Sequence, residues 1–268
     1  MRYKLIAADI DGTLLNSKGR LTEETKQAIR QAVDKGVVFA ISTGRPLQGL
    51  KPVVDEIGFD LPLITYNGAM LIMGKSQNVI YEKKLSRDNC IKVLELGKER
   101  GTNIVVWNDN KLYCDKINSK TIEYGKLTRT KPILSEHLDK TVDTGATKIL
   151  WYDDIPLISK YEKEINEIFR GSINVHISRP MFLEFVDKDA SKAIAMHKLG
   201  EYYGIDRSEM IAIGDSSNDI SMIEYAGLGI AMENARKDIK DKADYVTLSN
   251  DDNGVAHVIR KFILQDDH

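Results

Sequence analysis

Short apolar runs alternate with helical segments over the first 65 residues, and this rhythm constrains the fold most strongly. The runs Tyr3–Ile10, Val37–Ile41 and Leu61–Thr65 have the length of buried strands. Between the first two, Thr22–Asp34 has helical apolar spacing, and Pro46 suits the first turn of a second helix. Strands and helices in alternation predict a parallel sheet with right-handed crossovers.

The same rhythm returns near the C-terminus. Helical spacing covers Ser191–Tyr203, which Gly204 ends, and further strands and helices are predicted at 210–213, 220–225, 227–232, 244–247 and 256–264. Since both ends of the chain carry this pattern, we predict an α/β fold whose parallel-sheet core is formed by residues 1–84 and 188–268.

Residues 85–187 have a different texture. After a hairpin predicted around Gly74, helices are expected at 89–100 and 155–169, with short strands at 104–107, 111–114, 147–152, 174–177 and 182–186. This mixture predicts a second, α+β domain inserted between the two halves of the core. The aromatic residues of the segment are expected to be core rather than substrate contacts: Trp107, Tyr113, Trp151, Tyr152 and Phe182.

The composition excludes several classes of protein. A net charge of −2 without a basic block provides no field that would attract nucleic acid or an anionic membrane. No apolar run is long enough for a transmembrane helix, and the N-terminus lacks the features of a signal peptide. Cys90 and Cys114 match no metal or redox spacing, so we expect reduced thiols in a cytoplasmic protein. A monomer is the default expectation, with a dimer left open.

Polar residues follow the predicted strands at the edge where an open α/β sheet binds ligands. They are Asp9 and Asp11 after the first strand, Thr43 and Gly44 after the second, and Asp215, Asn218 and Asp219 after a late strand. If these strands are neighbours, at least three carboxylates converge and repel one another unless a cation or protons are bound. Such an oxygen-rich cluster suits Mg²⁺, which also binds substrate phosphate.

Asp9 and Asp11 have a spacing that suits phosphoryl transfer through a covalent intermediate. One carboxylate can form an aspartyl-phosphate, while the second protonates the leaving group and then takes a proton from water. Taken alone, this segment is equally consistent with a turn or a calcium-type loop, and Gly214–Asp219 with a capped helix start. Their joint occurrence at strand ends favours the catalytic interpretation.

Lys192 follows Ser191, the expected N-cap of a helix. A cation at that end opposes the helix macrodipole, and a local rule broken at a predicted domain junction is a mild signal of function. The helix end and the ammonium would both attract phosphate. Spacing alone, however, favours an ordinary solvated surface lysine.

Together these segments resemble, in order and spacing, the four motifs of haloacid-dehalogenase-type phosphatases. Asp9–Leu15 resembles the first motif, DxDGT(L/I)L, and Ile41–Arg45 the second, whose hydroxyl residue binds phosphate. Lys192 falls where the lysine of the third motif is expected, although Asp189–Ala193 lacks the glycines that often surround it. Gly214–Asp219 is similar to the fourth motif, GDxxND.

Tyr66–Ala69 and Ala231–Ala235 are similar to the Cof-type branch of this family (subfamily IIB), which carries an α/β cap between motifs two and three. The resemblance spans essentially the whole chain. It implies a Rossmann-like core, with residues 85–187 as a cap that closes over the site and selects the leaving group. It also implies Mg²⁺-dependent hydrolysis of small phosphomonoesters, either sugar phosphates or phosphorylated cofactors.

The resemblance further implies a role for each matched residue. Asp9 would be nucleophile and metal ligand, and Asp11 would be the acid/base that also gives its backbone carbonyl to the metal. Other metal ligands would be Asp215, Ser216 and Asp219. The phosphoryl group would be held by Ile10, Thr43, Gly44, Lys192 and Asn218.

Two other functions are compatible with the same residues. A phosphomutase of the same superfamily shares the aspartyl-phosphate but returns the phosphoryl group to a second substrate instead of water. A phospho-accepting regulator or binding protein would store the group on Asp9 as a signal. Receiver domains of that kind are about half this length and need no inserted cap, and an acid/base at Asp11 favours turnover.

Overall fold

The computed structural model describes residues 2–265 and divides into two compact units. Of the described residues, the first unit comprises 2–44, 51–81 and 191–265, and the second comprises Arg45–Leu50 and Glu82–Ala190. The sequence pattern did not indicate that Arg45–Leu50 groups with the second unit.

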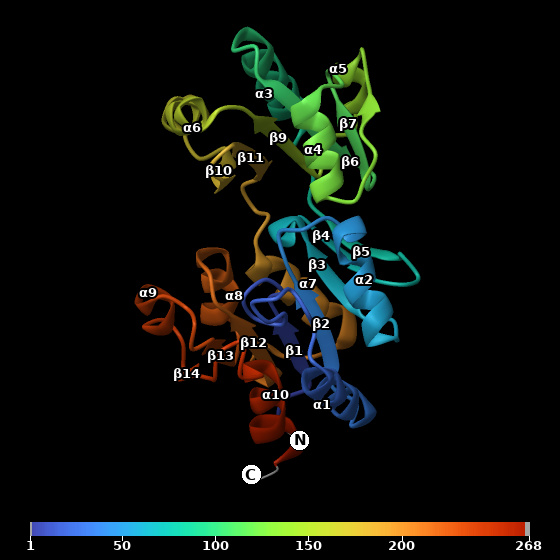
Figure 1. The fold of residues 1–268 in the computed structure, drawn as a ribbon, viewed down its shortest axis with the longest axis vertical. Helices are drawn as coiled ribbons and strands as arrows, with labels where there is room; N and C mark the ends of the chain where they lie inside the picture. The colour runs from blue at the N-terminus through green and yellow to red at the C-terminus, as the bar shows by residue number, and fades with distance from the viewer. Residues whose placement is uncertain (1, 266–268) are drawn as a thin grey trace. The chain divides into compact units, whose positions relative to one another are not determined.

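An eight-stranded sheet forms the centre of the first unit, in the order β14-β13-β12-β1-β2-β3-β4-β5 (Figure 1). The strands from β14 to β3 run parallel, and β4 pairs antiparallel with β3. Their bounds are β1 Leu5–Ala8, β2 Val38–Ser42, β3 Pro62–Thr65, β4 Met70–Met73, β5 Val79–Glu82, β12 Met210–Gly214, β13 Leu228–Ala231 and β14 Tyr245–Val246. This sheet confirms the predicted α/β class.

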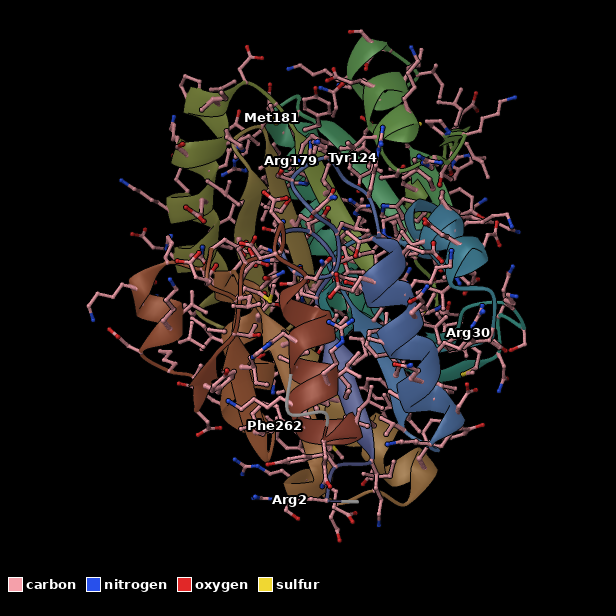
Figure 2. All side chains as sticks on the ribbon, turned by 60° about the horizontal axis from the view of Figure 1, so that its bottom comes forward. Arg2, Arg30, Tyr124, Arg179, Met181 and Phe262 are labelled. Carbon is pink, nitrogen blue, oxygen red and sulfur yellow. The ribbon has the colours of Figure 1, made fainter. Side chains whose placement is uncertain are left out.

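Helices flank this sheet: α1 Glu23–Asp34, α2 Leu47–Ile57, α7 Lys192–Tyr203, α8 Ile220–Tyr225, α9 Lys237–Lys240 and α10 Gly254–Ile259. Thr22 caps α1 by accepting the N–H of Thr25, and Gly204 ends α7 in the left-handed conformation. Figure 2 shows α1 and α10 side by side in front of the sheet, with Phe262 beyond the end of α10. Among the described residues, no helix combines the length and apolar character needed to cross a membrane.

Four short helical turns complete the unit: η1 Tyr66–Gly68, η2 Arg207–Glu209, η3 Ser217–Asp219 and η4 Arg260–Leu264. Two of them, η1 and η3, follow the carboxyl ends of β3 and β12. The central strand β1 is buried along its whole length, as expected for a parallel strand covered on both faces.

The second unit is built on a six-stranded sheet in the order β10-β11-β9-β6-β7-β8. Neighbouring strands of this sheet pair antiparallel, except for β7 and β8, which pair parallel. The elements are α3 Arg87–Glu99, β6 Asn103–Asn108, β7 Lys111–Cys114, α4 Ser119–Leu127, β8 Ile133–Leu134, α5 Leu138–Thr141, β9 Lys148–Tyr152, α6 Ile155–Phe169, β10 Ile173–Arg179 and β11 Phe182–Asp187. The sequence pattern did not predict α4, β8 or α5.

Aromatic side chains occupy the interior of the second unit, as the sequence predicted. Trp107 and Trp151 are completely buried, and Trp151 lies against Phe185 with 4.7 Å between ring centroids. Cys90 and Cys114 are free and buried, which agrees with the expected reduced thiols.

Candidate active site

Asp9 lies directly after the central strand β1, between the strands that carry the other candidate residues. Its backbone N–H donates to the carbonyl of Ile213 in β12, at 2.9 Å. The parallel register pairs Ala8 with both Ile41 and Ile213, so Asp9 is level with the ends of β2 and β12. The topology therefore brings the predicted residues to one edge of the sheet.

Lys192 begins α7 and points into this edge. Its Nζ lies 2.5 Å from Oδ1 of Asp9, 2.5 Å from Oδ1 of Asp219 and 3.1 Å from the carbonyl oxygen of Ser42. Only 1% of the residue is exposed. The interpretation of Lys192 as a solvated surface lysine is therefore wrong. Two carboxylates and a carbonyl replace the water around its ammonium, and the carboxylates offset the unfavourable interaction with the helix dipole.

Asp219 stabilises the conformation of the loop after β12. Its Oδ2 accepts the backbone N–H groups of Asp215 and Ser216, at 3.1 and 3.0 Å, while its Oδ1 contacts Lys192. The Ser216 hydroxyl donates to Oδ1 of Asn218 at 2.6 Å and lies 3.1 Å from Oδ2 of Asp219. Both oxygens of Asp219 are thus engaged within the protein, and Asp219 is fully buried.

Asp215 lies close to the loop that follows β1. Its Oδ1 accepts a hydrogen bond from the Thr13 hydroxyl at 2.7 Å. Gly12 has a φ of +86°, and a Cβ added there would lie 2.5 Å from Oδ2 of Asp215. Only glycine permits this approach. Sequence reasoning gave Thr13 no role, although a hydroxyl directly after the Asp-x-Asp-Gly segment could have indicated one.

Asp9, Asp215 and Asp219 form the acidic centre of the site, with carboxylate oxygens within 4.8 Å of one another. Together with Lys192 they carry two net negative charges when all are ionised. The predicted metal residues Asp11 and Ser216 are not part of this carboxylate group. Asp11 is exposed.

The burial of these groups shifts their proton affinities. Burial raises the pKa of Asp9 to about 8 against the attraction of Lys192, and Asp219 and Asp215 add to the increase. Burial also raises the pKa of Asp215 to about 6, which the Thr13 hydrogen bond opposes. Burial alone would lower the pKa of Lys192, but Asp9 and Asp219 outweigh it and raise that pKa, so Lys192 stays charged.

The predicted phosphate ligands lie on the segments around this centre. Thr43 is buried and its N–H donates to the carbonyl of Ile64 at 2.8 Å, while Ile10 is buried directly beside Asp9. Asn218 is exposed, and its Nδ2 donates to Oδ1 of Asn67 at 3.0 Å. A Cβ added to Gly44 would lie 2.9 Å from the same Asn67 oxygen.

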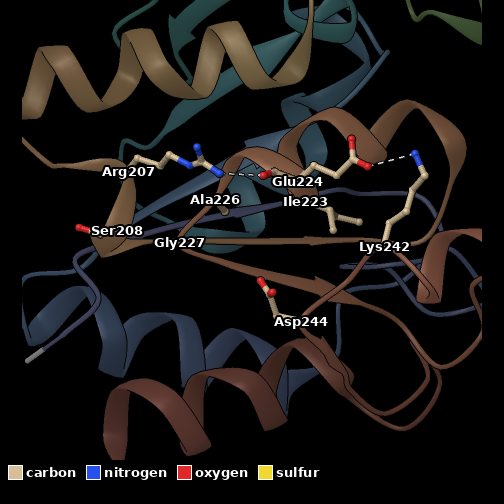
Figure 3. A pocket seen from close by; sticks show the side chains of 8 residues that line it. All are labelled: Arg207, Ser208, Ile223, Glu224, Ala226, Gly227, Lys242 and Asp244. Carbon is tan, nitrogen blue, oxygen red and sulfur yellow. Dashed lines mark hydrogen bonds and ion pairs between the residues drawn. The ribbon is translucent and has the colours of Figure 1, made fainter.

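A separate pocket of about 450 Å³ contains none of these residues (Figure 3). It lies where β12, β13 and β14 begin, at the opposite edge of the sheet, and its lining includes Arg207, Glu224, Lys242 and Asp244. Glu224 pairs with Lys242 at 3.1 Å and accepts a hydrogen bond from Arg207 on its backbone carbonyl at 3.0 Å. The predicted residues meet at the carboxyl edge of the sheet and not in this pocket, so the carboxyl edge is the candidate active site.

Comparisons with known proteins support one family. Residues 6–259 match the family model described as haloacid dehalogenase-like hydrolase. A putative phosphatase, YxeH, of Bacillus subtilis is 33% identical over 98% of this chain and 99% of its own length. The 5-amino-6-(5-phospho-D-ribitylamino)uracil phosphatase YcsE of the same organism is 34% identical over 97% and 96%. A haloacid dehalogenase-like hydrolase from Bacteroides thetaiotaomicron superimposes with a TM-score of 0.87 at 31% identity, covering 97% of this chain and all of that one.

Proposed function

We propose that this chain, which belongs to the Cof-type branch of the haloacid dehalogenase-like hydrolases and is a phosphatase, hydrolyses small phosphomonoesters. In this proposal, Asp9 carries the phosphoryl group during the reaction. The observation that carries this proposal is the buried contact of Lys192 with Asp9, 2.5 Å at the carboxyl edge of the sheet. A fixed cation beside a carboxylate suits the negative charge that develops when a phosphoryl group is transferred.

In the proposed reaction, the carboxylate of Asp9 attacks phosphorus in line with the leaving oxygen. Asp11 donates a proton to that oxygen, so the alcohol leaves as a neutral molecule. Asp11, now a carboxylate, then removes a proton from the water that attacks the aspartyl-phosphate. The exposure of Asp11 supports this role, because an acid/base at the surface can exchange its proton between turnovers.

The residues present fit a divalent cation, since three carboxylates and one ammonium carry two net negative charges when all are ionised, and a cation would favour the ionised carboxylates. We propose Mg²⁺, held by the side chains of Asp9 and Asp215 and the carbonyl of Asp11. Asp219 supports the site through its contacts with Lys192 and the loop. Ser216 stays a predicted ligand, and its hydroxyl donates to Oδ1 of Asn218 within the loop. When bound, Mg²⁺ would supply neutralisation of charge on the phosphoryl oxygens.

The remaining oxygens of the phosphoryl group are assigned to donors on the surrounding segments. Lys192 supplies its ammonium and Thr43 its hydroxyl, while Gly44 and Ile10 supply backbone N–H groups. Asn218 supplies its side-chain amide. These assignments are supported by the position of all five residues beside Asp9 and Asp219 on the same edge of the sheet.

For the substrate we propose a sugar phosphate or a phosphorylated cofactor precursor. YcsE, which aligns with nearly the whole chain, is named for the phosphate ester of a ribitylamino-pyrimidine. We attribute the choice of leaving group to the inserted segment 85–187, which the sequence predicts to be the cap.

A panel of phosphorylated metabolites, assayed with Mg²⁺ for release of inorganic phosphate, tests this proposal. The panel should include sugar phosphates and 5-amino-6-(5-phospho-D-ribitylamino)uracil. We expect a clear preference in kcat/KM for one of these classes, and loss of phosphate release in Asp9→Asn or with a chelator. Activity that survives either treatment would overturn the mechanism. Transfer of phosphate between two positions of a sugar, without release, would instead identify a mutase.

A further inference from the structure

The turn η1, Tyr66–Gly68, has a strained backbone beside the site. Tyr66 and Asn67 both adopt positive φ, 51° and 55°, and Gly68 follows at 98°. Two consecutive non-glycine residues in the left-handed region are uncommon, and a bulky aromatic residue there is unfavourable. Such strain persists only where surrounding contacts determine the conformation, and it clusters at functional sites.

This turn contacts three segments, and each of them carries a proposed phosphate ligand. The N–H of Asn67 donates to the carbonyl of Thr43 at 3.0 Å. A Cβ added to Gly68 would lie 2.1 Å from the carbonyl oxygen of Ser191 and 2.7 Å from the nitrogen of Lys192, so the turn packs directly on the start of α7. The third segment is the loop of Asn218, which the Asn67 side chain reaches.

The Asn67 side chain fixes how the Asn218 amide is oriented. Ser216 donates its hydroxyl to Oδ1 of Asn218 at 2.6 Å, and Nδ2 of Asn218 donates to Oδ1 of Asn67 at 3.0 Å. A side-chain amide carries two N–H donors, so one is used by Asn67 and one is left for a ligand. With these two contacts, the Asn218 amide places its oxygen toward Ser216 and its NH₂ group toward Asn67.

Asn67 also explains why Gly44 has no side chain. A Cβ at Gly44 would lie 2.9 Å from Oδ1 and 3.2 Å from Nδ2 of Asn67. Any larger residue would push Asn67 away from Asn218. The Asn67 carboxamide thus lies between two of the segments that hold phosphate, in contact with both.

We propose that Asn67 is a positioning residue of the phosphate site: it acts through Asn218 and Gly44, without itself binding the substrate. This inference rests on the proposed function, since it assigns Asn218 to the phosphoryl group. Asparagine suits the position because it tolerates the left-handed backbone and presents an acceptor oxygen.

The variant Asn67→Gly tests the side chain alone, because glycine adopts the same φ without strain. We expect kcat/KM to fall about three- to tenfold, the effect of one hydrogen bond, with a weaker inhibition by inorganic phosphate. The matched control is Gln77→Gly, which removes a side chain at a φ of 57° in the turn between β4 and β5 and should leave kcat/KM unchanged.

A double-mutant cycle separates positioning from a general structural effect. If Asn67 acts through Asn218, Asn67→Gly should cause little further loss of kcat/KM in an Asn218→Ala background. Asn67→Asp keeps an acceptor oxygen for Asn218, so Asn218→Ala should again lower kcat/KM in that variant. Equal losses from Asn67→Gly in both backgrounds, or no loss in the wild-type background, would overturn the inference. A wild-type protein that releases no phosphate from any substrate would instead contradict the proposed function.

Discussion

Thr13 donates a hydrogen bond to Asp215 at 2.7 Å, although the two residues are 202 positions apart in the chain. The contact joins the loop after β1 to the loop after β12, and these loops carry the proposed nucleophile and the proposed metal ligand. Because a hydroxyl donor stabilises the ionised carboxylate, Thr13 keeps Asp215 closer to the form that can bind a cation.

Thr13→Val should therefore weaken Mg²⁺ binding. The pKa of Asp215, already raised to about 6 by burial, would rise further without the opposing hydrogen bond. Mg²⁺ must then displace a proton over a wider pH range, so we expect a half-saturating Mg²⁺ concentration about tenfold higher near pH 6.5 and a smaller effect at pH 8.5. Titration of phosphate release with Mg²⁺ at both pH values measures this.

The matched control for Thr13→Val is Thr102→Val in the second unit. The Thr102 hydroxyl is buried and has no hydrogen-bond partner among residues 2–265, so the isosteric change removes nothing that the structure uses. Its Mg²⁺ dependence should equal that of the wild type. An unchanged Mg²⁺ dependence in Thr13→Val as well would contradict the role of the Thr13–Asp215 contact.

The positions of Asp9, Thr43 and Asp215 were predictable from the sequence. Each follows an apolar run long enough to be a buried strand, and parallel strands bring their carboxyl ends to one edge. The burial of Lys192 was not predictable in the same way. Its partners are 183 and 27 residues away, and the local helix rule favours exposure.

The missed elements of the second unit lack the periodic signal that identified the others. The helix α4 is short and begins at a capping box formed by Asn118 and Thr121, and Ile122 and Leu127 on it are exposed. Because α4 has large apolar residues on its exposed face, its sequence does not show the single apolar stripe that identifies an amphipathic helix. The strand β8 has only two residues, too few for an alternating pattern.

The metal-free protein should lose stability as the pH rises. Burial raises the pKa of Asp9 from its ordinary value of 3.8 to about 8 in the folded state, so the folded protein binds more protons than the unfolded chain between these values. The free energy of unfolding then decreases with pH in that window, by at most about 1.4 kcal/mol per pH unit for one proton.

Urea unfolding with a chelator at pH 5, 6, 7 and 8 measures this slope. Asp9→Asn should flatten the slope above pH 6, because the amide does not titrate and the pKa of Asp215 is about 6. Saturating Mg²⁺ should flatten the slope in the wild type. Asp55→Asn, at an exposed position of α2, should keep the wild-type slope. If Asp9→Asn kept it as well, the raised pKa of Asp9 would not be its source.

Lys192→Met should abolish activity and destabilise the fold. Removing the ammonium leaves Asp9 and Asp219 buried without a cation, which costs about 3–5 kcal/mol for a buried pair. Protonation of the carboxylates relieves part of the loss, so the destabilisation should be smaller at pH 5.5 than at pH 8. Urea unfolding at the two pH values measures the difference.

The control for Lys192→Met lies on the same helix. The side chain of Lys198 is 39% exposed and pairs with Glu201 at 2.7 Å, so Lys198→Met should change stability little and leave activity intact. A second variant, Lys192→Met with Asp219→Asn, should recover part of the stability but none of the activity. Equal destabilisation by Lys192→Met at both pH values would contradict the proposed burial of uncompensated charge.

Gly12→Ala should impair the site more than its backbone strain explains. Alanine at a φ of +86° is strained, and its Cβ would also lie 2.5 Å from Oδ2 of Asp215. We expect a loss of stability of about 1–3 kcal/mol. Because Asp215 must move, kcat/KM should fall more than about tenfold and the half-saturating Mg²⁺ concentration should rise.

Gly19→Ala separates strain from displacement. Gly19 has a φ of +69°, and no described heavy atom lies within 4 Å of an added Cβ. Gly19→Ala therefore strains the backbone without displacing a neighbouring side chain. This variant should lose stability, as Gly12→Ala does, yet keep the wild-type kcat/KM and Mg²⁺ dependence. If the two variants lost activity equally, backbone strain in the loop would be the cause. A selective loss in Gly12→Ala would show that the close approach of Asp215 to Gly12 matters for catalysis.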